Sequence, residues 1–157
     1  MNELHGHFKF IKRAKDWLDP GDYLPDFAGF HVHNGIKLDP RPRSCLFLFF
    51  IDTECEPCGD SLNTLYKMLS EYDLPVTILV STPDADKFEV LKDAFDGMAD
   101  VHRYSLKEMR AHFRTGATPW GYGINSVGQI ITSSVCGNRA EFLRLVQPFR
   151  GLIGEVG

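Results

Sequence analysis

The chain has 157 residues, of which 43% are hydrophobic, and its 17 Lys and Arg against 21 Asp and Glu give a formal net charge of −4. A chain of this length forms one domain that buries ~70% of its unfolded surface, so it needs neither a disulfide framework nor a metal to fold. The mild acidity argues against a nucleic-acid-binding protein, which normally carries a basic face. Four cysteines are also too few for a disulfide scaffold.

The sequence shows no membrane span and no export signal. Its longest apolar run, residues 45–51, has seven residues, whereas a membrane-spanning helix needs ~20. This run predicts a buried strand. No apolar signal-peptide core follows Met1. The expectation is a cytoplasmic protein, or an extracytoplasmic, membrane-tethered one if an upstream anchor is missing from this sequence.

The first 20 residues form a separate N-terminal extension. Residues 8–18 place apolar side chains at helical spacing with lysines and an arginine between them, and Asp19-Pro20-Gly21 ends this basic amphipathic helix. One interpretation is contact with an anionic membrane surface. The other, which we favour, is a peripheral helix packed on its own domain.

A β-hairpin follows, with strands over residues 27–33 and 36–38. Asn34-Gly35 between them suits the positive φ angles of a type I′ turn. His31 and His33 alternate onto one face and are metal-ligating residue types. Without a third ligand in view, we interpret them as surface histidines and expect no metal.

The remaining chain alternates helical and extended patterns. Helices are predicted over residues 58–72, 88–95, 105–113 and 138–149, and strands over residues 76–80, 120–125 and 129–135. With the strand at residues 45–51, this order predicts a three-layer α/β/α domain: a mixed central sheet with helices on both faces, extended by the N-terminal hairpin.

The strongest chemical signal is the quartet Cys55-Glu56-Pro57-Cys58, which directly follows the buried strand and opens a helix. Cysteines three apart at a helix start can bring their Cα atoms to the ~5.5 Å that a disulfide prefers. Unpaired N–H groups and the helix dipole favour an anion at Cys55, which lowers the pKa of a thiol there. Pro57 fits the first turn, and Cys58 lies on the apolar face as the shielded thiol. The quartet predicts thiol–disulfide exchange through a mixed disulfide at Cys55.

The quartet has two other interpretations. A structural zinc site needs a second cysteine pair at ligand spacing, and the remaining Cys45 and Cys136 are single. Two unrelated core thiols are the other interpretation. The placement between a strand and a helix favours redox chemistry.

A second feature lies about sixty residues further on, at Thr118-Pro119-Trp120. A proline directly before a predicted strand is compatible with a strand start or with a cis peptide bond. A cis Thr118–Pro119 bond would let Thr118 offer its N–H and C=O to a substrate peptide beside the dithiol. An ordinary trans proline at a strand start is the alternative.

Together these motifs resemble the thioredoxin-fold thiol-disulfide oxidoreductases, and among them the TlpA/ResA-like, AhpC/TSA-related branch. The resemblance spans roughly residues 21–149. It is carried by the G-x-x-x-P-x-F segment at residues 21–27, the C-E-P-C motif at 55–58, Thr118-Pro119, and residues 124–130. It implies a thioredoxin-like domain over residues 21–150, followed by a tail over 151–157, and no cofactor.

Departures from the family pattern concern the charged residues. Glu54 stands where family members usually have tryptophan, and with Glu56 it should oppose ionisation of Cys55. An ungapped alignment places Asp84 where the branch has an acid, so Asp84, with Glu54, is a candidate for proton transfer to Cys58. The alternative for Asp84 is a helix-start residue.

The leading hypothesis is an enzyme that reduces protein disulfides, with protein thiols and disulfides and an upstream electron donor as partners. Glu56, Pro57, Thr118, Pro119 and Trp120 would contact or orient the substrate. A thiol peroxidase is the second hypothesis, weakened because Asp52, not threonine, stands three residues before Cys55. The third is a non-catalytic binding module.

Two further residue pairs concern the interior. Cys45 and Cys136 are interpreted as small apolar fillers, which could bridge only if their strand ends meet. The glycines of Trp120-Gly121-Tyr122-Gly123 are unusual in a central strand, and allow close approach by a partner or by a neighbouring side chain.

Overall fold

The computed structural model describes residues 18–24, 31–33, 36–40, 42–115 and 117–155. The predicted basic helix lies outside these residues apart from Leu18, and so does the Asn34-Gly35 turn. No helix among the described residues is long and apolar enough to span a membrane.

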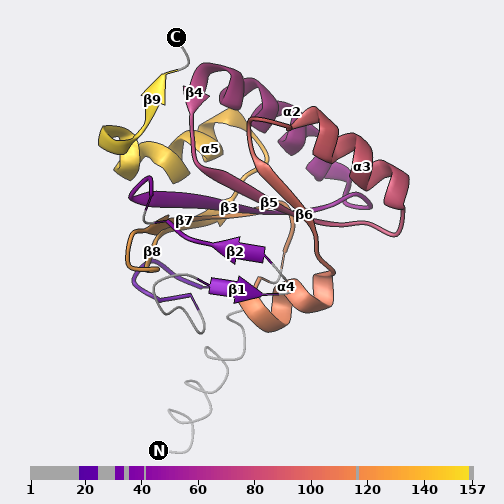
Figure 1. The fold of residues 1–157 in the computed structure, drawn as a ribbon, viewed down its shortest axis with the longest axis horizontal. Helices are drawn as coiled ribbons and strands as arrows, with labels where there is room; N and C mark the ends of the chain where they lie inside the picture. The colour runs from indigo at the N-terminus through magenta and orange to yellow at the C-terminus, as the bar shows by residue number, and fades with distance from the viewer. Residues whose placement is uncertain (1–17, 25–30, 34–35, 41, 116, 156–157) are drawn as a thin grey trace, which may run out of the picture.

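A five-stranded mixed sheet forms the centre of the domain (Figure 1). Its order is β6-β5-β3-β7-β8. The strands are β3 (Cys45–Asp52), β5 (Val76–Ser81), β6 (Asp100–Arg103), β7 (Trp120–Asn125) and β8 (Ile130–Val135). Strands β3, β5 and β6 run parallel, whereas β7 is antiparallel to both β3 and β8. The predicted mixed sheet is confirmed, with β6 as its edge strand beside β5.

The apolar run predicted as a buried strand becomes β3, the middle strand of the sheet. Because side chains alternate along a strand, both faces of β3 are covered. Phe47, Phe49 and Ile51 enter one hydrophobic cluster, and Leu46, Leu48 and Phe50 enter another. Asp52 is the first polar residue of the strand and is only half-buried. The chain therefore reaches the surface at the carboxyl end of β3.

Helices cover both faces, as predicted. On one face lie α2 (Glu56–Glu71), α3 (Ala85–Ala94), α5 (Arg139–Val146) and the 3-10 helix η1 (Gln147–Leu152), and on the other lies α4 (Leu106–Phe113) (Figure 1). The predicted capping box opens α4: the Ser105 side chain accepts from the Glu108 N–H, and the Glu108 carboxylate accepts from the Ser105 N–H.

The chain that leads into the domain packs on the α4 face. The buried Tyr122 hydroxyl accepts a hydrogen bond from the Leu18 N–H and donates one to the Phe113 carbonyl, both at 3.0 Å. The predicted hairpin is present as β1 (His31–His33) and β2 (Ile36–Leu38), paired antiparallel. Leu18, Leu24 and Leu38 belong to the same cluster as Tyr122.

Two local expectations were wrong. Tyr72 does not lie on the helix but in strand β4 (Tyr72–Asp73), which pairs with β9 (Gly154–Glu155) near the C-terminus. The apolar spacing that predicts this helix also places Tyr66 on its buried face with Leu65 and Leu69, but Tyr66 is 46% exposed, and Met68 is buried instead. Helical spacing alone did not distinguish these neighbours, because the helix face is fixed by contact with the sheet and α5.

Candidate active site

The Cys55-Glu56-Pro57-Cys58 quartet sits where β3 ends and α2 begins. A tight turn joins them, with the Cys55 N–H donating to the Asp52 carbonyl at 3.1 Å. Cys55 is the N-cap of α2, and Pro57 occupies its first turn, where a missing N–H costs no helical hydrogen bond. The N–H groups of the first helical turn therefore gather around the Cys55 position.

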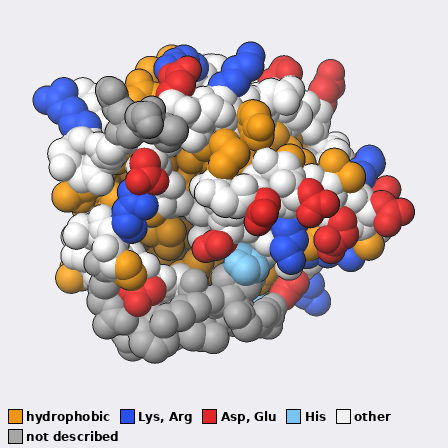
Figure 2. Space-filling model, turned by 45° about the horizontal axis from the view of Figure 1, so that its top comes forward, with side chains coloured by type: hydrophobic (Ala, Val, Ile, Leu, Met, Phe, Trp, Pro, Cys, Tyr) orange, Lys and Arg blue, Asp and Glu red, His pale blue; other side chains and the backbone are white. Residues whose placement is uncertain are grey.

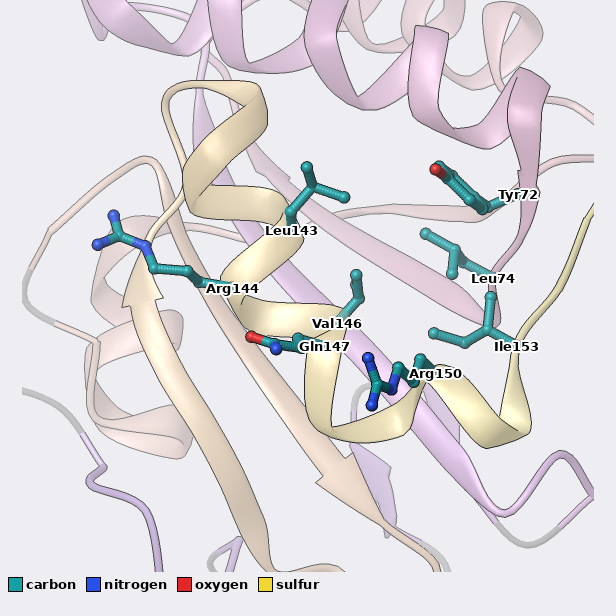
Figure 3. A pocket seen from close by; sticks show the side chains of 8 residues that line it. All are labelled: Tyr72, Leu74, Leu143, Arg144, Val146, Gln147, Arg150 and Ile153. Carbon is teal, nitrogen blue, oxygen red and sulfur yellow. The ribbon is translucent and has the colours of Figure 1, made fainter.

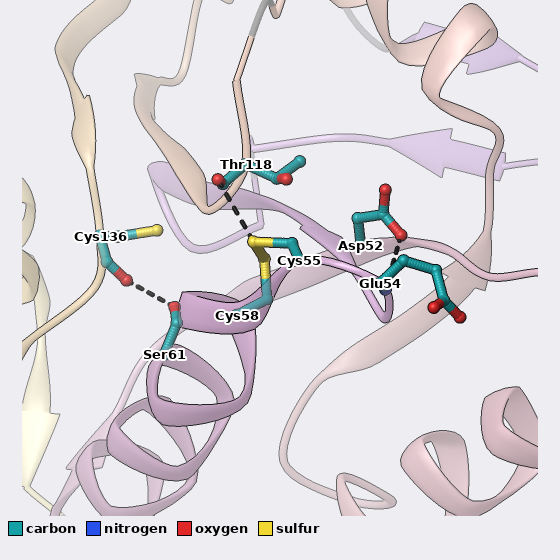
Figure 4. The surroundings of a disulfide bond; sticks show 7 residues. All are labelled: Asp52, Glu54, Cys55, Cys58, Ser61, Thr118 and Cys136. Carbon is teal, nitrogen blue, oxygen red and sulfur yellow. Dashed lines mark hydrogen bonds between the residues drawn. A yellow bond between two sulfur atoms is a disulfide. The ribbon is translucent and has the colours of Figure 1, made fainter.

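Cys55 and Cys58 form a disulfide with a Cα–Cα distance of 5.3 Å (Figure 4). The two sulfurs differ in access: Cys55 is half-buried, whereas Cys58 is 1% exposed and belongs to the core cluster. An attacking partner can therefore reach Cys55 and not Cys58. This asymmetry divides the pair into an outer and a shielded sulfur.

The loop before β7 lies directly against the outer sulfur. The Sγ of Cys55 is 3.4 Å from the Thr118 carbonyl oxygen (Figure 4), a distance at which a reduced Cys55 thiol would donate to it. The Thr118–Pro119 peptide bond is cis. Trp120 follows as the first residue of β7, half-buried and paired with Phe50. The tertiary structure thus brings together two motifs that are 63 residues apart.

The glutamates beside Cys55 are exposed, and Glu54 does not approach the sulfurs. The Glu54 N–H donates to Oδ1 of Asp52 at 2.9 Å, while its own carboxylate points away from the disulfide (Figure 4). Glu56 and Pro57 are exposed on the first turn of α2. Both therefore lie where a docking partner would meet them.

A cavity of about 460 Å³ opens beside the shielded sulfur. We name it the α2–α3 groove; it is lined by Asp52, Thr53, Cys58, Gly59, Leu62, Asp84, Asp86, Lys87, Val90 and Leu91. Asp84 caps α3, its Oδ1 accepting from the N–H groups of Asp86 and Lys87 at 2.9 and 3.3 Å. The helix-start role is thus realised, and the same residue lines a cavity with Cys58.

Asp52 is a site residue that the sequence interpretation missed. It lines the α2–α3 groove together with Cys58 and Asp84. The available signal was its place as the first carboxylate after a fully apolar strand, which had to emerge at the same sheet edge as the CxxC motif. A chain of hydroxyl contacts braces this edge, because Thr53 Oγ1 donates to Thr82 Oγ1 at 2.8 Å and the Asp84 N–H donates to Thr82 Oγ1 at 3.1 Å.

The other two cysteines are free thiols in the core. Cys45 pairs with Asn125, whereas Cys136 follows the residue that pairs with Trp120. Trp120 and Asn125 are five residues apart on β7, which corresponds to ~17 Å in an extended strand. Cys45 and Cys136 therefore lie near opposite ends of β7, too far apart for a disulfide. Burial raises the pKa of both thiols. They are core residues, as predicted, and do not form a bridge.

Neighbouring side chains, not a partner, explain the two strand glycines. A Cβ on Gly121 would lie 2.8 Å from atoms of Phe49 and Leu145. A Cβ on Gly123 would meet Thr132 Oγ1 and lie 2.6 Å from Phe149. The missing side chains let α5 and η1 pack closely on the sheet.

A second cavity, of about 380 Å³, lies at the other end of α2 (Figure 3). Tyr72, Leu74 and Ile153 face Leu143 and Val146 across it. A 16-residue helix spans ~24 Å, so this cavity is remote from the disulfide. In the described part of the chain, no three His, Cys, Asp or Glu residues cluster as a metal site.

The sheet order, the helical layers and the disulfide at the start of α2 define a thioredoxin fold. Similar solved structures include a peroxiredoxin-like protein from Aquifex aeolicus, with 12% identity, a TM-score of 0.57, and 87% of this chain and 88% of that chain covered. A thio-disulfide isomerase from Thermus thermophilus gives 19% identity, a TM-score of 0.53, and 86% and 97% coverage.

A third similar structure is assigned as the thiol:disulfide interchange protein DsbE of Chlorobium tepidum, with 20% identity, a TM-score of 0.53, and 86% and 98% coverage. No protein-family model matches the sequence, and no curated protein matches it significantly. The similarity therefore confirms the predicted thioredoxin-like fold.

Proposed function

We propose that this protein is a thiol-disulfide oxidoreductase that exchanges its Cys55–Cys58 pair with protein disulfides and acts as a reductant. The observation that carries this proposal is the disulfide at the start of α2, with one accessible and one shielded sulfur. Such an arrangement separates attack on a partner from release of that partner.

In the first step, the reduced Cys55 thiolate attacks one sulfur of a partner disulfide. The partner S–S bond breaks, one partner sulfur leaves as a thiolate, and a mixed disulfide forms at Cys55. The N-cap position supports this step because helix N–H groups and the helix dipole stabilise the thiolate.

In the second step, the Cys58 thiolate attacks the Cys55 sulfur and releases the second partner thiolate. The Cys55–Cys58 disulfide forms, and two electrons have passed to the partner. A dithiol electron donor upstream then attacks Cys55 and restores the reduced pair. The 5.3 Å Cα–Cα distance already suits this ring closure.

The loop at Thr118 would orient the substrate. Its carbonyl oxygen faces Cys55 Sγ and can accept an N–H from a peptide laid beside the sulfur. Pro119 and Trp120 would form the wall behind that peptide, and the exposed Glu56 and Pro57 the rim on the α2 side. These five residues are the proposed substrate contacts.

Cys58 must lose a proton before it can attack, and the α2–α3 groove provides the route. Asp84 and Asp52 line the groove with Cys58, and its 460 Å³ accommodates water, which needs ~30 Å³ per molecule. We propose that a water-bridged carboxylate in this groove accepts the proton. We favour Asp52 and Asp84 over Glu54, because these two residues line the groove with Cys58 and Glu54 does not.

The test uses two single variants of the reduced protein with an insulin disulfide as substrate. We expect Cys55→Ser to abolish reduction, because no nucleophile remains accessible. We expect Cys58→Ser to accumulate a mixed disulfide with the substrate, visible by mass spectrometry, because release is blocked. Full activity of Cys55→Ser contradicts the proposal, and so does rapid peroxide consumption by Cys58→Ser with no mixed disulfide formed with the substrate.

A further inference from the structure

The α2–α3 groove has a second property that proton transfer does not require: its floor is apolar and open. Leu62 and Leu91 are half-buried, and Val90 is 67% exposed. No residue within α3 is fully buried, so this helix covers the sheet loosely and presents apolar side chains to the groove. Exposed apolar surface next to a reactive sulfur is typical of an interaction site.

The rim of the groove is acidic. Asp52, Asp84 and Asp86 contribute three carboxylates against the single ammonium of Lys87. Within the described part of the chain, these three carboxylates bond to backbone N–H groups or remain in solvent, and none pairs with a cation. Figure 2 shows several acidic side chains at the right of the molecule, on the side where α3 lies, with basic side chains among them.

The acidic character continues onto the exposed start of α2. Glu54, Glu56 and Asp60 are all exposed there, within the first turns around the outer sulfur. A partner that approaches Cys55 from this side therefore passes several negatively charged side chains. Anionic partners such as nucleic acid or acidic lipid would be repelled, whereas cationic segments would be attracted.

We propose that the α2–α3 groove is a docking site for the redox partner: it receives an apolar side chain flanked by Lys or Arg, close in sequence to the cysteine that exchanges with Cys55. The apolar side chain would pack on Leu62, Val90 and Leu91, and its basic neighbours would face Asp52, Asp84 and Asp86. This inference rests on the proposed function and names its substrate class.

The test compares two peptides that differ only in charge. Each carries one cysteine in a mixed disulfide with thionitrobenzoate, and a leucine flanked by two lysines or by two glutamates. Attack by reduced Cys55 on the peptide sulfur breaks that disulfide and releases coloured thionitrobenzoate, and Cys58 then releases the peptide thiol. We expect the lysine peptide to react at least ~10-fold faster at low salt. The preference should shrink in 0.5 M salt, at which screening shortens to a few ångströms.

Two groove variants locate the effect. Asp86→Lys should reduce the lysine preference several-fold, and Val90→Ser should slow both peptides. The matched control is Asp93→Lys, an exposed aspartate on the same helix that does not line the groove. The peptide rates of each variant are divided by its own rate with the neutral hydroxyethyl disulfide, which Asp93→Lys should reduce at the wild-type rate because Asp93 does not line the groove.

The outcomes separate the two proposals. Equal rates for both peptides, or an equal effect of Asp93→Lys and Asp86→Lys, overturn the docking site while reduction of hydroxyethyl disulfide stands. If neither peptide nor the neutral disulfide reacts in a Cys55-dependent way, the proposed function itself is wrong.

Discussion

The two ends of β3 are built from the same apolar strand but differ in what surrounds them. At the amino end, Cys45 is buried, and Phe47 packs against Phe149 with ring centroids 5.1 Å apart. At the carboxyl end, Asp52 reaches the surface, a turn follows, and the half-buried Cys55 opens α2 beside a cavity.

The difference shows that burial, and not residue type, decides what a cysteine can do here. Cys45, Cys58 and Cys136 share one core cluster and are almost fully buried. Of these three, only Cys58 is bonded to a sulfur that a partner can reach, the Sγ of Cys55. Cys55 in turn is the cysteine that stands at a helix N-terminus, that of α2. Under the proposed function, the carboxyl end of β3 therefore carries the chemistry, and the amino end carries stability.

The largest expected effect is on activity. The double variant Cys45→Ala, Cys136→Ala should retain disulfide reduction within about two-fold, whereas Cys55→Ser should fall to the uncatalysed rate. The reason is that the first two thiols are buried and bonded to no redox partner. Initial rates of insulin reduction measure both. If the double variant folds, as judged by circular dichroism, but loses its activity, the claim that Cys45 and Cys136 take no part in disulfide reduction is wrong.

A smaller effect is expected from packing. Gly123, which pairs with Phe47, leaves no room for a Cβ, whereas Gly59 on α2 has nothing within 4 Å. Gly123→Ala should therefore lower the free energy of unfolding by about 1–3 kcal/mol. Gly59→Ala should raise it by up to about 1 kcal/mol, because alanine is the better helix former. Urea unfolding of the reduced variants measures both changes, and equal signs would contradict this account of the two ends.

The smallest effect concerns pH. Burial raises the pKa values of the Cys45, Cys136, Tyr104 and Tyr122 side chains above their ordinary values. These four groups therefore lose their protons at a lower pH in the unfolded chain than in the folded protein. Their contribution to the free energy of unfolding is constant below pH ~8.5. It falls as the pH rises past ~8.5, where thiols of the unfolded chain ionise, and past ~10, where its tyrosines ionise. Urea unfolding at pH 7, 9 and 10.5 measures the decline. Cys136→Ala should flatten its first part, and an unchanged curve would show that this thiol ionises freely.

Sequence patterns predicted most of the fold because they are local. Uninterrupted apolar residues specified β3, and the Ser105 and Glu108 spacing specified the start of α4, since each depends on neighbours within a few residues. The tail near Gly154 gave no such signal, because its strand exists only through pairing with Tyr72 and Asp73.

The sequence by itself determined the Cys55–Cys58 pair and its place between a strand and a helix, because a four-residue motif at a strand end has few possible geometries. Only the tertiary structure decided which distant groups join it. It placed the Thr118 carbonyl 3.4 Å from Cys55, brought Asp52 and Asp84 to one groove beside Cys58, and separated Cys45 from Cys136. Those relations depend on strand order and register, which side-chain periodicity does not encode.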